Sequence, residues 1–139
     1  VGQRKMTTTN TPSESGNPAS PEALEALRRA AAIDLPDDYI AFLAISNGGE
    51  SPLGIEPGYI VIDSAGDATS QKLQRTFEEF FPGFFVFGGN GGGELFAFDH
   101  RGSRPWPVVM IDMTNIDLKD SVVRVADDFS QLAQQMGVE

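Results

Sequence analysis

The chain has 139 residues, and ten Lys and Arg against twenty Asp and Glu give it a formal net charge of −10. This length predicts a single domain with its own core, and the absence of cysteine excludes disulfides, thiolate nucleophiles and cysteine-based metal sites. The acidity disfavours binding to nucleic acids and to anionic membranes.

Two interpretations of the charge stay open at this point: it keeps the domain soluble, or it attracts a basic protein partner. The sequence has no run of about 18 apolar residues and no apolar segment behind its basic N-terminal residues. We therefore expect neither a membrane span nor a signal peptide, and a cytoplasmic location.

Residues 1–19 are rich in Thr, Ser, Asn and Pro and show no apolar periodicity. Such a composition predicts a flexible N-terminal segment, followed by a domain that spans residues 20–139. Met6 is a candidate for the natural start, in which case residues 1–5 are an added segment.

Two helices are expected next. Ser20 and Pro21 are typical of an N-cap and a first helical position, and this helix should end before Pro36. Pro36 then opens the second helix, and Asn47-Gly48 predicts a left-handed stop. The side chains expected to face the core are Leu24, Leu27, Ala31, Tyr39, Ile40, Phe42 and Leu43.

The middle of the chain predicts a loop over residues 50–58, a short strand over 59–63 and an amphipathic helix that begins near Asp67. Leu73, Phe77, Phe80 and Phe81 recur at helical spacing, and Pro82 breaks the pattern.

Residues 84–87 and 94–99 predict strands with apolar side chains on both faces. Such a sheet is covered on both sides, or on one side by helices and on the other by a partner. Residues 107–113 and 121–126 predict two more strands. A last helix should begin at Asp127-Asp128, bury Phe129, Leu132, Ala133 and Met136, and stop at Gly137. This order predicts an α+β fold in which several helices pack on a mostly antiparallel sheet.

Five glycines stand within the six residues 88–93, between two expected strands. A loop that binds phosphate leads into a helix and usually supplies a Lys and a Ser or Thr. Here a strand follows, and Glu94 and Asp99 would repel phosphate. We therefore interpret the segment as a hairpin turn that uses positive φ angles, including one at Gly93, and close backbone approach.

Other combinations of residues do not predict a catalytic, metal or cofactor site. His100 is the only imidazole, and its neighbour Asp99 should point to the opposite face of a strand. Asp112, Asp117 and Asp120 lack the ligand spacing and the central glycine of a calcium loop. Trp106 is expected in the core.

Several motifs together resemble the SUKH superfamily, the Smi/Knr group named after a fungal regulator of cell-wall synthesis. They are LPDDYIAFLAISNGG, the glycine-rich reversal before ELFAFD, PVVMIDM and VRVADDFSQLAQQMG. The similarity extends over most of residues 20–137. The resemblance implies an α+β domain without catalysis, in which Pro36, Asn47, Gly48, Gly49, Gly92 and Gly93 are structural.

Bacterial relatives in this superfamily resemble immunity proteins that neutralise a toxin, commonly a nuclease or deaminase, and eukaryotic ones serve as regulatory scaffolds. Since a nuclease must be basic, the resemblance favours a basic toxin as partner. A regulatory module without a toxin is the alternative, and a nucleotide-binding enzyme is a third, weaker hypothesis. We expect the partner to contact loop or strand-end carboxylates, namely Glu50, Glu56, Glu94, Asp117 and Asp120.

Overall fold

The computed structural model describes residues 17–75, 81–113 and 121–138. Its strands form a six-stranded antiparallel sheet in which the spatial order follows the chain. The strands are β1 (Gly49–Pro52), β2 (Tyr59–Ile62), β3 (Phe84–Gly89), β4 (Glu94–Asp99), β5 (Val108–Asp112) and β6 (Val122–Ala126), and the helices are α1 (Pro21–Ala31), α2 (Asp37–Ile45), α3 (Ala65–Leu73) and α5 (Phe129–Gln135).

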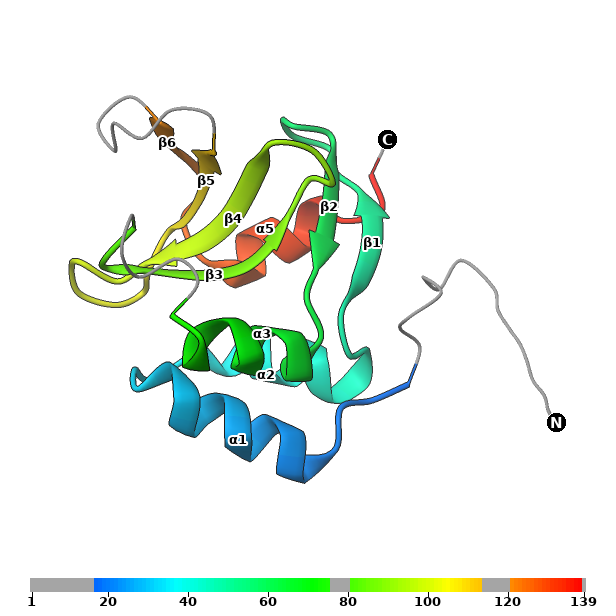
Figure 1. Cartoon of the computed structure of the whole chain (residues 1–139). Helices are drawn as coiled ribbons and strands as arrows, with labels where there is room; N and C mark the ends of the chain where they lie inside the picture. The colour runs from blue at the N-terminus through cyan, green and yellow to red at the C-terminus, as the bar shows by residue number, and fades with distance from the viewer. Residues whose placement is uncertain (1–16, 76–80, 114–120, 139) are drawn as a thin grey trace, which may run out of the picture.

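The expected α+β fold is confirmed. Figure 1 shows α5 lying across the sheet and α1, α2 and α3 grouped together beside it. Among the described residues no helix is both long and apolar enough to cross a membrane.

The central strands bury side chains on both faces, as their composition predicts. Phe85 and Phe87 of β3 join the main core with the helices, whereas Phe84 and Val86 join a second cluster on the opposite face. This alternation follows from the two-residue period of a strand. In the main core, Tyr39 of α2 makes ring contacts with four Phe side chains, namely Phe85, Phe87, Phe98 and Phe129.

The starts of three helices agree with the sequence. The hydroxyl of Ser20 accepts a hydrogen bond from the backbone N–H of Ala23, and the carboxylate of Asp128 accepts one from Gln131. Pro36 precedes α2, whose first turn carries Asp37 and Asp38, where the helix dipole favours carboxylates.

The expected stop of α2 is wrong in detail. The helix is capped by Ser46, which has extended backbone angles and donates its N–H to Phe42. Gly48 does have a positive φ of 89°, but it leads into β1 instead of closing the helix. Gly48 also lies so close to β2 that a Cβ atom would approach the carbonyl oxygen of Ile62 to 2.6 Å, so this position has no room for a side chain.

The loop expected over residues 50–58 contains a strand that the sequence did not predict. Residues Gly49–Pro52 form β1 and pair with β2, with Glu50 opposite Val61. Glycine, glutamate and proline are poor strand formers, so backbone pairing overrides propensity. Proline is tolerated because β1 is an edge strand.

The third helix also differs from the expectation. It begins at Ala65, capped by Ser64, and ends at Leu73; Arg75 then has a positive φ of 57°. Leu73 is 69% exposed, and the helix buries the small side chains of Ala65 and Ala68 instead. Phe81 joins the second core cluster, whereas Phe77 and Phe80 lie outside the described residues. Small side chains suit a helix that packs closely against its neighbour, and periodicity of large apolar residues misses them.

The packed structure begins before residue 20. The N–H of Ala19 donates to the carbonyl oxygen of Leu43, and Asn47 donates to that of Asn17. The domain boundary at residues 19 and 20 stays a prediction, and residues 1–16 lie outside the described part of the chain.

Candidate functional site

The glycine-rich segment forms the turn between β3 and β4, as its hairpin interpretation predicts. A Cβ atom on Gly88 would overlap the carbonyl oxygen of Val61 on β2, and one on Gly89 would lie 2.9 Å from the carbonyl oxygen of Glu94. Gly91 has a positive φ of 80°, which side chains disfavour. The fold therefore requires a glycine at each of these three positions.

Asn90 fixes the geometry of this turn. Its Oδ1 accepts hydrogen bonds from the backbone N–H groups of Gly92 at 2.8 Å and Glu94 at 3.2 Å, and its Nδ2 donates to Oε1 of Glu94 at 2.7 Å. A phosphate-binding loop works by offering free backbone N–H groups to the anion. Here Asn90 occupies two of those groups, and a carboxylate stands beside them.

Gly92 and Gly93 are not explained in the same way. The positive φ expected at Gly93 is wrong, because the left-handed residue of the turn is Gly91. Gly92 also lies outside the left-handed region, and a Cβ atom there would meet only the side chain of Asn90, at 3.4 Å or more. The fold gives no reason for a glycine at position 92.

A shallow cavity of about 260 Å³, the glycine hollow, opens beside this turn. Val61, Gly89 and Leu95 lie opposite one another on β2, β3 and β4. Because residues in register share one face of a sheet, the missing side chain of Gly89 leaves a gap between Val61 and Leu95. The lining of the glycine hollow includes Asp63, Gln71, Glu94 and four glycines of residues 88–92.

A second cavity, the β1 hollow, adjoins the first and has a volume of about 290 Å³. The two cavities share Val61 and Asp63. The acidic residues Glu50, Asp63 and Asp67 all line the β1 hollow, together with Asn47. None of the described residues that line either hollow is Lys, Arg or His, so this surface is concave and negative.

Asp63 is the residue that joins the two hollows. It follows β2, is half-buried, and its Oδ2 accepts a hydrogen bond from Nε2 of Gln71 at 3.3 Å. Partial burial raises the pKa of Asp63, and the nearby charge of Asp67 raises it further. The Oε1 atom of Gln71 is itself buried without a hydrogen-bond partner.

The hydroxyl of Tyr39 is also buried without a hydrogen-bond partner. Its pKa is raised, first by burial and then by the negative charge of Asp63. The neighbourhood of Asp63 therefore holds two buried polar atoms that the fold leaves unsatisfied, on Gln71 and Tyr39.

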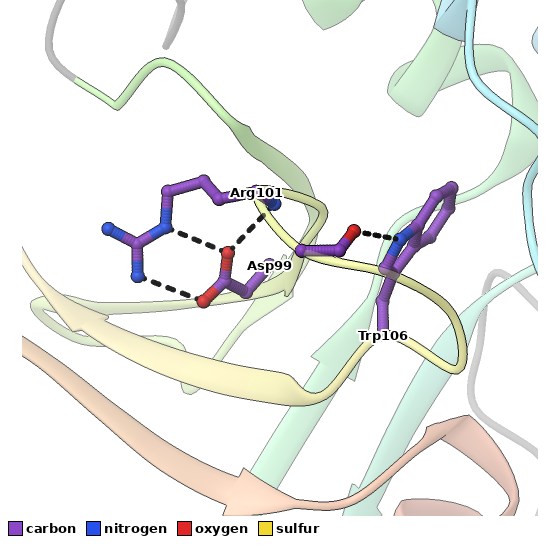
Figure 2. Close-up of polar contacts among 4 residues, drawn as sticks. Asp99, Arg101 and Trp106 are labelled. Carbon is purple, nitrogen blue, oxygen red and sulfur yellow. Dashed lines mark hydrogen bonds and ion pairs between the residues drawn. The ribbon is translucent and has the colours of Figure 1, made fainter.

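Three carboxylates outside the two hollows are paired with arginines. Figure 2 shows Asp99 bound by Arg101 through two side-chain hydrogen bonds of 2.9 Å each, and the backbone N–H of Arg101 also donates to this carboxylate. The side-chain hydrogen bonds lower the pKa of Asp99. Two further ion pairs link Arg104 to Asp34 at 2.6 Å and Arg124 to Asp127 at 2.8 Å. The three arginines thus neutralise charge away from the two hollows.

The family described as SMI1 / KNR4 family (SUKH-1) has a sequence model that matches residues 18–135, which is most of the chain. The chain belongs to the SMI1 / KNR4 family. Comparison with curated proteins gives no match. The resemblance drawn from the sequence motifs is confirmed. Two of those motifs lie on either side of β2, namely the Asn-Gly segment that leads into β1 and the glycine-rich hairpin between β3 and β4.

Three of the positions expected to be structural, Asn47, Gly48 and Gly49, connect α2 to β1 in this SMI1 / KNR4 domain. Oδ1 of Asn47 accepts a hydrogen bond from the N–H of Ala65 at 2.8 Å, which ties the end of α2 to the start of α3. Gly48 has no room for a side chain, and Gly49 has a φ of 133°. Their structural roles, and that of Pro36 before α2, stay predictions.

Of the carboxylates expected to contact a partner, the structure brings Glu50 and Glu94 to the adjoining hollows. Glu50 also accepts a hydrogen bond from the Tyr59 hydroxyl. Glu56 is exposed but lines neither hollow, and Asp117 and Asp120 lie outside the described residues. The sequence did not predict Asp63 and Asp67 as site residues, because one stands at the end of an expected strand and the other at the start of an expected helix, and only the fold brings both to the β1 hollow.

The other candidates take structural places. Trp106 is 8% exposed and belongs to the main core, as expected, and its Nε1 donates to the carbonyl oxygen of Gly102 at 3.3 Å (Figure 2). The ring of His100 lies 5.8 Å from that of Trp106, centroid to centroid, while the carboxylate of Asp99 is engaged by Arg101. In the described part of the chain, no group of three or more His, Cys, Asp or Glu residues could hold a metal ion.

Proposed function

We propose that this SMI1 / KNR4 domain is a non-catalytic protein-binding domain, and specifically an immunity protein that neutralises a basic toxin by direct contact in the cytoplasm. The observation that carries the proposal is the gathering of Glu50, Asp63, Asp67 and Glu94 around two adjoining hollows that no described positive side chain lines.

The charge supports a basic partner on physical grounds. A nuclease toxin holds nucleic acid with Lys and Arg side chains. A concave negative surface attracts such a face over a distance and accelerates association. Covering that face would also exclude the nucleic acid, so binding alone would be enough for neutralisation.

The test is co-expression of the chain with the protein encoded by the neighbouring gene. We expect the chain to rescue cells from the toxicity of that protein and to form a stoichiometric complex with a nanomolar dissociation constant. The double variant Glu50→Gln/Glu94→Gln should weaken the complex. The matched control Glu22→Gln/Glu25→Gln removes the same charge from α1, where Arg28 and Arg29 lie in the same shallow groove, and should not.

Absence of both complex and rescue would overturn the immunity proposal. Weak, salt-sensitive binding to several proteins from an unbiased pull-down would then favour the regulatory module.

A further inference from the structure

We propose that the glycine hollow is an anchor site for an arginine side chain of a protein partner. The proposal rests on the proposed function and deepens it, because it names the group on the partner that enters this surface. It answers the question left by Gly92, whose missing side chain the fold does not require.

The acceptors that line the glycine hollow match a guanidinium group. Asp63 and Glu94 line it together with Gln71, and Oε1 of Gln71 has no hydrogen-bond partner within the protein. Arginine presents five N–H donors in a planar fork and can donate to several such acceptors at once. A lysine ammonium is a more strongly hydrated point charge and loses more on leaving water. The hollow should therefore prefer arginine to lysine.

The floor of the glycine hollow suits a flat group. Four of its ten lining residues, Gly88, Gly89, Gly91 and Gly92, contribute no side chain. Glycine is the residue that allows a ligand to approach backbone closely. The fold itself requires glycine at positions 88, 89 and 91. It does not require glycine at position 92, and a bound partner side chain in the hollow would account for the glycine there.

The glycine hollow fits a cation better than the β1 hollow does, although both are acidic. The β1 hollow is lined by Ser64 and Asp67 at the start of α3. The N-terminus of a helix carries a partial positive charge, which disfavours the binding of a cation there. No residue of the first turn of α3 lines the glycine hollow.

The experiment titrates the full chain with the acetylated, amidated tripeptides Gly-Arg-Gly and Gly-Lys-Gly and follows amide signals by NMR. We expect the arginine peptide to shift the signals of Gly91, Gly92, Glu94 and the Gln71 side chain and to half-saturate at a concentration several-fold lower than the lysine peptide.

Two pairs of variants locate the site. Gly92→Leu adds a large side chain at a residue that lines the hollow, and its control Gly102→Leu adds the same side chain where a Cβ atom meets nothing. Glu94→Gln removes a charge from the lining, and its control Glu25→Gln removes one from α1. The first member of each pair should weaken binding of the arginine peptide about three- to tenfold, and the control should leave it unchanged.

Equal titration by the arginine and lysine peptides would overturn the proposal, as would equal effects of Gly92→Leu and Gly102→Leu. Because the peptides replace the partner, the two proposals fail separately. If the chain rescues cells from a toxin but shows no preference for the arginine peptide, only the arginine-site proposal is overturned. If it prefers the arginine peptide but has no toxin partner, only the immunity proposal is overturned.

Discussion

Asp63 is half-buried, and its one described hydrogen-bond donor is the neutral amide of Gln71. A carboxylate in such a place loses hydration without gaining a cation in return, which is why its pKa is raised. Asp99, by contrast, has the guanidinium of Arg101 and a lowered pKa. The unfavourable environment of Asp63 is consistent with a positive group that arrives from a partner.

Replacing Asp63 with Asn should therefore stabilise the free protein at neutral pH, by on the order of 1 kcal/mol. A raised pKa means that the folded state binds the proton more tightly than the unfolded state. The contribution of protonated Asp63 to the free energy of unfolding is therefore fully present below the ordinary pKa of 3.8. It is lost as the pH rises through the higher pKa that Asp63 has in the folded state. Urea unfolding of wild type and Asp63→Asn across this range should show curves that converge at low pH.

Asp67 provides the matched control for this variant. It is exposed in the first turn of α3, where a carboxylate is favourable to the helix dipole. Asp67→Asn loses this interaction but also relieves the repulsion between Asp67 and Asp63, so it should lower the free energy of unfolding by only a few tenths of a kcal/mol at neutral pH. If Asp63→Asn also lost stability at neutral pH, our account of Asp63 would be wrong.

The glycines of the hairpin should respond differently to the same added methyl group. Gly88→Ala forces a Cβ atom against the backbone of β2 and should lower the free energy of unfolding by about 1–3 kcal/mol or more, as overpacking does. Gly92→Ala brings its Cβ atom only to van der Waals distance from the side chain of Asn90, at 3.4 Å or more, and should stay within about 0.5 kcal/mol. Equal losses in urea unfolding at both positions would contradict the distinction on which the arginine site depends.

At the scale of elements, the sequence correctly indicated the caps of α1 and α5, but it did not indicate the buried face of α3 or the pairing of β1. The starts of α1 and α5 could be located because Ser20 and Asp128 act within their own turn. The strand β1 could not, because it forms only by pairing with β2. The two hollows could not be predicted from the sequence either. The sequence indicates that Glu50 and Glu94 are loop or strand-end carboxylates, but only the register of the sheet brings them to one concave surface.

The sequence predicts a helix start at the pair Asp127-Asp128, and in the structure the two residues have different roles. Asp128 caps α5 through the N–H of Gln131 at 2.8 Å, so Asp128→Ala should cost about 1 kcal/mol. Asp127 forms an exposed ion pair with Arg124, and such pairs contribute only roughly 0–1 kcal/mol. Thermal unfolding should therefore place the midpoint of Asp128→Ala below that of Asp127→Ala, and the reverse order would reassign the cap.

At the scale of the molecule, the position of the charge matters more than its total. The chain carries a net charge of −10, and Arg101, Arg104 and Arg124 each form an ion pair with one acidic side chain, outside the two hollows. The two hollows contain no described positive residue. Cavities lined by one sign of charge concentrate the electric field. A basic partner should therefore be guided toward the hollows and not toward the chain as a whole.

This view predicts that two charge reversals with the same effect on net charge will act differently on association. Glu50→Lys/Glu94→Lys should slow binding to a basic toxin about tenfold at low ionic strength, since steering of this kind raises association rates by tenfold or more. Glu22→Lys/Glu25→Lys on α1 should have a much smaller effect. The difference between the association rates of the two variants should shrink as salt is added, because the Debye length falls to about 10 Å at 0.1 M ionic strength. Stopped-flow association rates measure both variants, and equal slowing would show that net charge, not the hollows, guides the partner.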